Sequence, residues 1–200
     1  MTSTGWSLSS GEERMSKTYD LITRWSDEPI DCKTRVGCTF ERNSFIFTFD
    51  VDEAAACFRQ ACRCDGDPCW EDSCVEVFLQ SGRDKAQYFN FECSSSGAML
   101  GEVGVGRGER RRFSADEYGV IKREATFLER GERVRWRLKV AIPAHFIGVY
   151  DEKTLRGNLY KCGSKAACVH YQSAFDIGSD KPDFHRPESF RAIFEEEEMR

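Results

Sequence analysis

The alternation of apolar and polar residues along 134–142 constrains the fold more than any other feature of the chain. Val134, Trp136, Leu138, Val140 and Ile142 are apolar, and the residues between them are mostly basic. A period of two places successive side chains on opposite faces of an extended strand, whereas a helix needs a period near 3.6. The segment is therefore predicted to be a strand with one buried face and one basic face.

The same alternation recurs in three other segments, 45–51, 75–79 and 89–93. Helical periodicity is scarce, and the best short helix candidates are 52–60 and 144–147. Strands bounded by Gly, Pro, Asp and Ser favour an antiparallel arrangement, because a parallel α/β fold needs substantial helices between its strands. We expect an all-β, jelly-roll-like antiparallel β-sandwich with few short helices.

Length and the lack of internal boundaries indicate one domain. The chain has 200 residues, with no internal repeat and no Pro- or Gly-rich linker. We expect a single domain over residues 1–200, in which the polar residues 1–15 are disordered.

Charge and hydropathy narrow the range of partners and locations. The formal net charge is -5, so nucleic acid is not an expected partner. The basic runs 107–112 and 130–137 contain interspersed Glu and Gly and are interpreted as solvated faces. No apolar run is long enough to span a bilayer, so no membrane partner is expected. Because no signal peptide is visible, we expect a cytoplasmic location, or an extracellular one if residues were removed before Met1.

The ten cysteines leave the redox state open. A reducing cytosol would keep the thiols free, whereas an even number also permits disulfides. The four cysteines between residues 62 and 74 lack the paired spacing of a structural zinc site, so buried free thiols are the favoured interpretation. Cys162 and Cys168 flank a short loop and could face each other across it.

Calcium is the cofactor that the sequence suggests, although no cofactor is firmly predicted. Asp65 and Asp67 flank Gly66 in one acidic loop. Oxygen-rich loops suit Ca²⁺, but this spacing is not that of an EF-hand. Asp65 and Asp67 are the expected ligands if calcium binds.

Two segments combine aromatic and charged residues in the way that a sugar site requires. Trp70, Glu71 and Asp72 precede the strand predicted at 75–79, and the irregular segment 181–188 contains Phe184, His185 and Arg186. Sugar rings offer flat C–H faces for stacking and hydroxyls for charged partners. The alternatives are a core role for Trp70, turn formation by Glu71 and Asp72, and structural hydrogen bonds for His185.

The polar faces of the predicted strands offer a second set of candidates. One strand presents Glu76, another presents Glu92, and a third presents the basic row that includes Arg137. Neighbouring strands would place these side chains on one face, where they would form either cross-strand ion pairs or a ligand groove. Glu76 and Glu92 could also serve as the acid and base of a glycoside hydrolase, which is the enzymatic alternative.

Several blocks, taken in order, resemble the family 9-like carbohydrate-binding modules. They are Trp70–Phe78, Tyr88–Glu92, Trp136 with Ala141–Pro143, Asn158–Gly163, His170–Ser173 and Pro182–Phe190. The resemblance implies a β-sandwich of jelly-roll type that grips a mono- or oligosaccharide between two aromatic rings, serves carbohydrate catabolism and can carry calcium. Trp70 would be the first ring, and Tyr171, Phe175 or Phe184 the second.

We therefore expect non-catalytic saccharide binding, with no catalytic residue assigned. The alternatives are a hydrolase that acts on glycosyl bonds through paired carboxylates, and a protein-interaction module without a sugar ligand. The expected ligand-binding residues are Trp70, Glu71, Asp72, Glu92, Arg137, Tyr171, Phe175, Phe184, His185 and Arg186.

Overall fold

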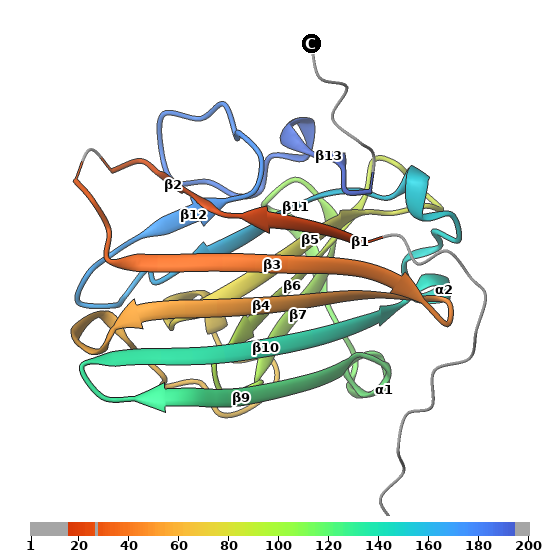
Figure 1. Ribbon diagram of the computed structural model, residues 1–200. Coiled ribbons are helices and arrows are strands. Elements are labelled where there is room, and N and C mark those ends of the chain that lie inside the picture. Colours follow the sequence, from red (N-terminus) through yellow and green to blue (C-terminus); the bar gives the residue numbers. More distant parts are fainter. Residues whose placement is uncertain (1–15, 27, 195–200) are drawn as a thin grey trace, which may run out of the picture.

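Two antiparallel β-sheets pack face to face in the computed structural model, which describes residues 16–26 and 28–194 (Figure 1). Sheet A has the strand order β1-β3-β4-β10-β9. Its strands are β1 (Ser16–Asp20), β3 (Cys32–Glu41), β4 (Ser44–Ala54), β10 (Arg133–Pro143) and β9 (Lys122–Arg130).

Sheet B has the order β2-β12-β11-β5-β6-β7-β8, with β13 paired to β11. Its strands are β2 (Ile22–Arg24), β12 (Tyr171–Ser173), β11 (Arg156–Cys162), β5 (Cys74–Gln80), β6 (Tyr88–Ser94), β7 (Met99–Val105), β8 (Glu109–Arg112) and β13 (Arg191–Ala192). The helices are α1 (Ala115–Val120) and α2 (Ala144–Ile147), and 3-10 turns occupy Ala55–Cys57, Cys69–Glu71, Glu152–Thr154 and Pro187–Ser189.

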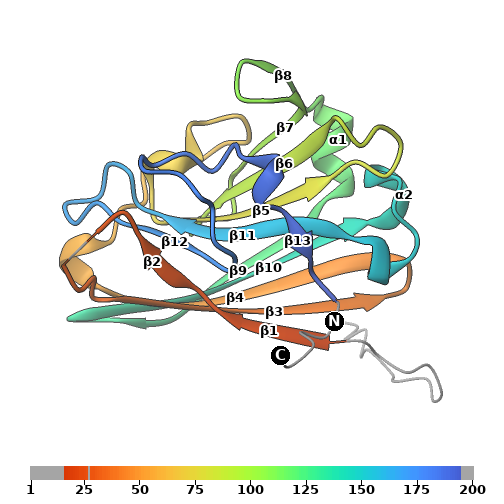
Figure 2. The same ribbon diagram turned by 90° about the horizontal axis from the view of Figure 1, so that it is seen from above.

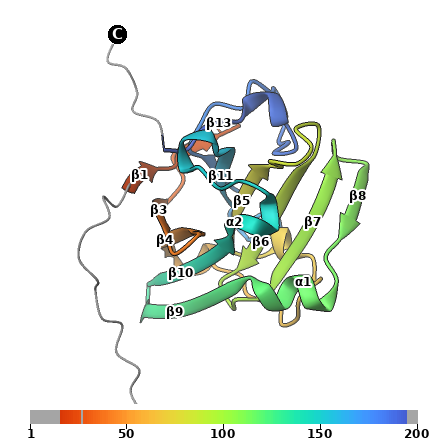
Figure 3. The ribbon, with the colours of Figure 1, turned by 90° about the vertical axis from the view of Figure 1, so that its right-hand side faces the viewer.

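The core lies between the two sheets, which Figure 3 shows in side view. Alternate residues of β4, β10, β5 and β6 point into it, among them Phe47, Trp136, Val77 and Phe91, all essentially inaccessible to solvent. Burial of these side chains at about 25 cal/mol per Å² is the main force that holds the sheets together. The four predicted strands and the antiparallel β-sandwich are confirmed.

The helix predictions had mixed outcomes. The helix at 144–147 is confirmed as α2, whereas the helix predicted over 52–60 is wrong. There β4 continues to Ala54, because Val51 and Glu53 point inward and the strand pairs with β10, and only a 3-10 turn follows. No described helix is long and apolar enough to cross a membrane.

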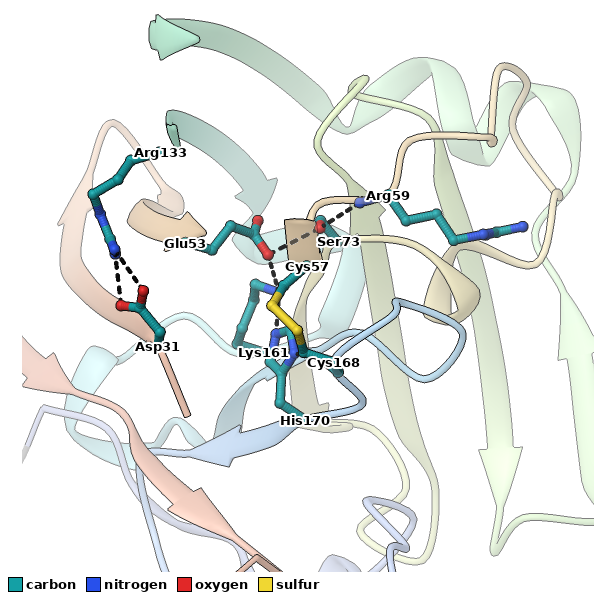
Figure 4. Close-up of a disulfide and its surroundings, with 9 residues drawn as sticks. All are labelled: Asp31, Glu53, Cys57, Arg59, Ser73, Arg133, Lys161, Cys168 and His170. Atoms are coloured by element: carbon teal, nitrogen blue, oxygen red, sulfur yellow. Dashed lines mark hydrogen bonds and ion pairs between the residues drawn. A yellow bond between two sulfur atoms is a disulfide. The ribbon is translucent and has the colours of Figure 1, made fainter. Parts of the chain in front are cut away.

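Cys57 and Cys168 form a disulfide, and the other eight cysteines are free (Figure 4). The redox state that the sequence left open is thus a disulfide at this pair, and Cys168 pairs with Cys57 rather than with Cys162 across the loop. The partners are 111 residues apart, because the fold brings the turn after β4 beside the β11–β12 loop. The disorder expected for residues 1–15 lies outside the described residues.

Candidate functional site

A cavity of about 390 Å³ lies over the outer face of sheet B. This volume falls in the range of small-molecule sites, roughly 300–1,000 Å³. Figure 2 shows the blue segment between β12 and β13 on this outer side of the sheet. The lining residues are Trp70, Glu76, Glu92, Leu100, Glu102, Arg107, Arg110, Cys162, Ser164, Tyr171, Pro182, Asp183, Phe184 and His185.

Trp70 stands at the edge of this cavity with 38% of its surface exposed. Its 3-10 turn is tied to the β11–β12 loop, because the carbonyl oxygen of Trp70 accepts a hydrogen bond from Ser164 Oγ at 2.7 Å and one from Cys162 Sγ at 3.3 Å. The backbone is thus fixed while the ring remains available for stacking. An exposed aromatic ring held by its own backbone suits a platform for a flat apolar ligand face.

Phe184 and Tyr171 supply two further rings. Phe184 stacks on Tyr160 with ring centroids 4.1 Å apart and an interplanar angle of 11°. The Tyr160 hydroxyl also donates to the Phe184 carbonyl oxygen at 3.2 Å. Tyr171 meets Phe184 edge to face at 5.9 Å. These contacts anchor the loop over sheet B and give the cavity an aromatic side near β11 and β12.

Two carboxyl groups lie on the cavity floor. Glu76 on β5 and Glu92 on β6 are direct cross-strand partners, and both side chains are almost completely buried. Burial raises the pKa of each carboxyl well above its usual range, and the neighbouring Glu76 raises that of Glu92 further. Glu92 Oε1 accepts from the Asn90 side-chain amide at 2.8 Å.

Arg110 on β8 forms the cationic side of the cavity, with only 3% of its side chain exposed. The guanidinium lies 4.0 Å from the centroid of the Tyr88 ring, donates to Asn90 Oδ1 and pairs with Glu102 at 3.4 Å. The interpretation of 107–112 as a wholly solvated run is therefore wrong at Arg110. The pairing of β8 with β7 turns this residue onto the same face as Glu102.

His185 is neutral at pH 7 in this environment. Burial, with the positive charges of Arg110 and Arg107, lowers the pKa of His185 to about 4. Its Nδ1 lies 2.8 Å from the Tyr88 hydroxyl, and its ring packs against Phe78. A neutral imidazole can offer a sugar hydroxyl either a donor or an acceptor.

Five of the residues that the sequence predicts as ligand contacts come together around this cavity: Trp70, Glu92, Tyr171, Phe184 and His185. Two other predicted residues lie beside it as supports. Glu71 pairs with Lys165 at 2.6 Å. Asp72 is fully buried, accepts from the backbone N–H groups of Ala61 and Cys62, and pairs with Arg59.

Three predicted residues lie away from the cavity lining. Arg137 is on the outer face of sheet A, where it pairs with Asp50 at 2.7 Å, because β10 belongs to the sheet opposite β5 and β6. Phe175 packs edge to face on Tyr19 beside the core. Arg186 pairs with Asp183 at 3.1 Å and steadies the loop that carries Phe184.

The carboxylates of Asp65 and Asp67 already accept hydrogen bonds within the protein. Asp65 forms ion pairs with Arg123 and accepts from the Met99 N–H group at 3.0 Å. Asp67 accepts from the N–H groups of residues 63 and 64. Within residues 16–26 and 28–194, the two groups with three possible metal ligands in close reach contain neither aspartate. These contacts give each aspartate a structural role in its loop.

Sequence reasoning did not place Arg110, Glu102, Arg107 or Cys162 at the site. The segment 109–112 is Glu-Arg-Arg-Arg, in which every residue is charged, so no alternation marks its inner and outer faces. The signal that could have found Arg110 is the spacing of strands β7 and β8 around the Gly-rich turn at 104–108.

A family model described as carbohydrate-binding family 9 matches residues 11–194, nearly the whole chain. The chain belongs to carbohydrate-binding family 9. No match was found among the curated proteins.

Two solved structures are similar to this family 9 chain. A candidate carbohydrate-binding protein from Bacteroides uniformis ATCC 8492 is 31% identical, with a TM-score of 0.77 over 87% of this chain and 84% of that one. A family 9 carbohydrate-binding module from Caldicellulosiruptor kristjanssonii, in complex with cellotriose, is 11% identical, with a TM-score of 0.53 over 86% and 80%. The second likeness concerns the fold alone.

Proposed function

We propose that this protein binds a mono- or oligosaccharide in the cavity over sheet B without catalysing a reaction, and that it serves carbohydrate catabolism. The observation that carries the proposal is the placement of three aromatic rings, Trp70, Tyr171 and Phe184, beside a polar floor in one cavity. Membership of carbohydrate-binding family 9 supports the same ligand class.

The cavity divides its chemistry between its two sides. Trp70 and Phe184 offer apolar faces, and each ring that covers a sugar face contributes on the order of 1–2 kcal/mol through the buried area. Arg110 and His185 can donate hydrogen bonds to the hydroxyl oxygens of a sugar. Glu92 and Glu102 can accept hydrogen bonds from its hydroxyl groups. Several directional partners on one floor would select among sugar stereoisomers.

The carboxyl pair supports binding better than hydrolysis. A glycosidase needs one ionised carboxylate as nucleophile or base beside one protonated acid. Burial instead shifts the pKa of both Glu76 and Glu92 upward, whereas an acid and a base in one site need environments that push their pKa values apart. A carboxyl group accepts hydrogen bonds from sugar hydroxyls in either protonation state, and it also donates one when it is protonated.

Calorimetric titration with a panel of mono-, di- and trisaccharides, cellotriose included, tests the proposal. Trp70→Ala is expected to weaken binding about tenfold or more. Tyr150→Ala is the matched control, because Tyr150 is an exposed aromatic outside the cavity lining. Sugar binding that survives Trp70→Ala unchanged, or no binding across the panel at millimolar sugar, would overturn the proposal. Analysis of the incubated oligosaccharides would reveal any hydrolysis.

A further inference from the structure

Two cysteines and a carboxylate converge on the cavity floor. Cys74 on β5 and Cys162 on β11 are direct cross-strand partners, and Glu76 follows two residues after Cys74 on the same face. The two sulfur atoms and a carboxylate oxygen of Glu76 all lie within 4.8 Å of one another. Cys162 Sγ is 2.9 Å from Glu76 Oε1.

This set of donors is one that zinc prefers. Zn²⁺ takes Cys sulfur at about 2.3 Å and carboxylate oxygen at about 2.0–2.2 Å in a tetrahedral arrangement. Donor atoms around such a centre stand roughly 3.3–3.8 Å apart, so donors that are already within 4.8 Å can close on one ion through small side-chain rotations. Thiolates also select soft or borderline ions over Mg²⁺ and Ca²⁺.

The cavity gives an ion both a route in and a free coordination position. Glu76 and Cys162 line the cavity wall, whereas Cys74 lies behind them. Glu92, the cross-strand partner of Glu76, is 4% exposed, and its Oε2 has no hydrogen-bond partner among the described residues. A buried acceptor without a donor is costly, and a cation beside it would remove that cost.

The other close group of possible ligands, Cys32, Glu53 and His170, is different. Glu53 accepts from Trp136 Nε1 at 2.7 Å and from Ser73 Oγ at 3.0 Å. The ammonium of Lys161 lies between Glu53 and His170, 3.5 Å and 2.7 Å from them. The ammonium of Lys161 therefore already supplies a positive charge to this group, and Glu53 and His170 have hydrogen-bond partners without a metal ion.

We propose that Cys74, Glu76 and Cys162 bind one zinc-like divalent ion at the cavity floor, with Glu92 beside the open fourth position. The two thiols, and the carboxyl of Glu76 where it is protonated, release their protons to the solvent when the ion binds, so affinity should fall as the pH is lowered. The site is independent of the sugar proposal, because its ligands are side chains of the protein alone. A bound ion would place a Lewis acid against any ligand in the cavity.

Cobalt titration of the full, purified chain under anaerobic conditions tests the site. Co²⁺ is expected to bind once per chain and to give a thiolate-to-cobalt charge-transfer band with tetrahedral visible absorption, and Zn²⁺ should displace it. Cys162→Ala and Cys74→Ala should abolish the band. Cys64→Ala should keep it, because Cys64 is an exposed free cysteine outside the group.

Glu76→Gln is a second test variant, which changes the carboxylate ligand but preserves the volume of the side chain. It should weaken Co²⁺ binding at least about tenfold while leaving the thiolate band at saturation, with circular dichroism to confirm the fold. The proposal is overturned by the absence of a charge-transfer band, by a band that persists in Cys162→Ala, or by peptide mapping that finds Cys74 and Cys162 joined as a disulfide in the isolated protein. No arm uses a sugar, so failure here leaves the binding proposal intact.

Discussion

The ammonium group of Lys161 lies 2.7 Å from Nε2 of His170, and both side chains are buried between the sheets (Figure 4). Nδ1 of His170 is 2.7 Å from the carbonyl oxygen of Cys168. The imidazole is therefore neutral, with Nδ1–H donating to that carbonyl and Nε2 accepting from Lys161. A second proton on His170 would both displace this bond and create two adjacent buried cations.

Acidification should destabilise the fold through His170. Burial and the charge of Lys161 lower its pKa to about 4, against roughly 6.5 in an unfolded chain. Between these values the unfolded state binds more protons than the folded state, so stability rises with pH. The free energy of unfolding should fall by up to about 3 kcal/mol as the pH is lowered from about 6.5 to about 4. Urea unfolding across this range measures the loss.

His170→Gln separates this contribution from the other titrating groups. The variant should lose part of the pH slope and keep the part due to His185, whose pKa is also lowered to about 4. His145→Gln should behave as the parent does, because His145 is exposed. An unchanged slope in His170→Gln would contradict the assignment.

Reduction of the Cys57–Cys168 disulfide should weaken the fold. The bond closes a loop of 111 residues, and a crosslink over such a loop restricts the unfolded chain and contributes about 2–4 kcal/mol. Guanidinium unfolding of the reduced chain and of the variant Cys57→Ala/Cys168→Ala should give the same free energy of unfolding, lower than that of the oxidised chain. Equal stability of the oxidised and reduced chains would show that the bond adds nothing.

The predicted cytoplasmic location stays a prediction. If the Cys57–Cys168 disulfide persists in the chain isolated from its native source, the extracellular alternative is favoured, because cytosolic thiols are normally kept reduced.

Most of the fold could be predicted from the alternation of apolar and polar residues, because a period of two is a local property of each strand. The partners of each strand are not local. Arg137 and Glu76 both lie on the polar faces of predicted strands, yet β10 and β5 belong to opposite sheets. The polar faces therefore point to opposite sides of the molecule, which no pattern within either strand reveals.

The candidate site shows the same division. Trp70 and Phe184 could be selected from the sequence, because aromatic residues in polar, irregular segments suit ligand contacts. Phe175 has the same composition around it, but Tyr19 on β1 covers it. Arg110 could not be predicted as a site residue, because every residue of 109–112 is charged. Nothing in that pattern indicates that one guanidinium packs over the Tyr88 ring.

Replacement of two arginines should give contrasting results. Arg110→Met removes a buried guanidinium that pairs with Glu102 and donates to Asn90, so it should cost about 3–5 kcal/mol of stability and weaken sugar binding. Arg137→Met removes a half-exposed pair with Asp50, so it should cost less than about 1 kcal/mol and leave binding unchanged. Thermal unfolding and sugar titration of both variants check this, and equal effects of the two would contradict it.

Two phenylalanines that the sequence could not separate should differ in the same way. Phe184→Ala removes a cavity wall and its stacking on Tyr160, so sugar affinity should fall about tenfold or more. Phe175→Ala removes a ring that packs on Tyr19 and the core, so it should lower stability by about 2–4 kcal/mol at unchanged affinity. Because both variants lose the same atoms, a general loss of packing would weaken binding equally in the two. Calorimetric titration at a temperature where both variants remain folded distinguishes the outcomes. Weaker binding by Phe175→Ala than by Phe184→Ala would indicate that the ligand binds outside the cavity over sheet B.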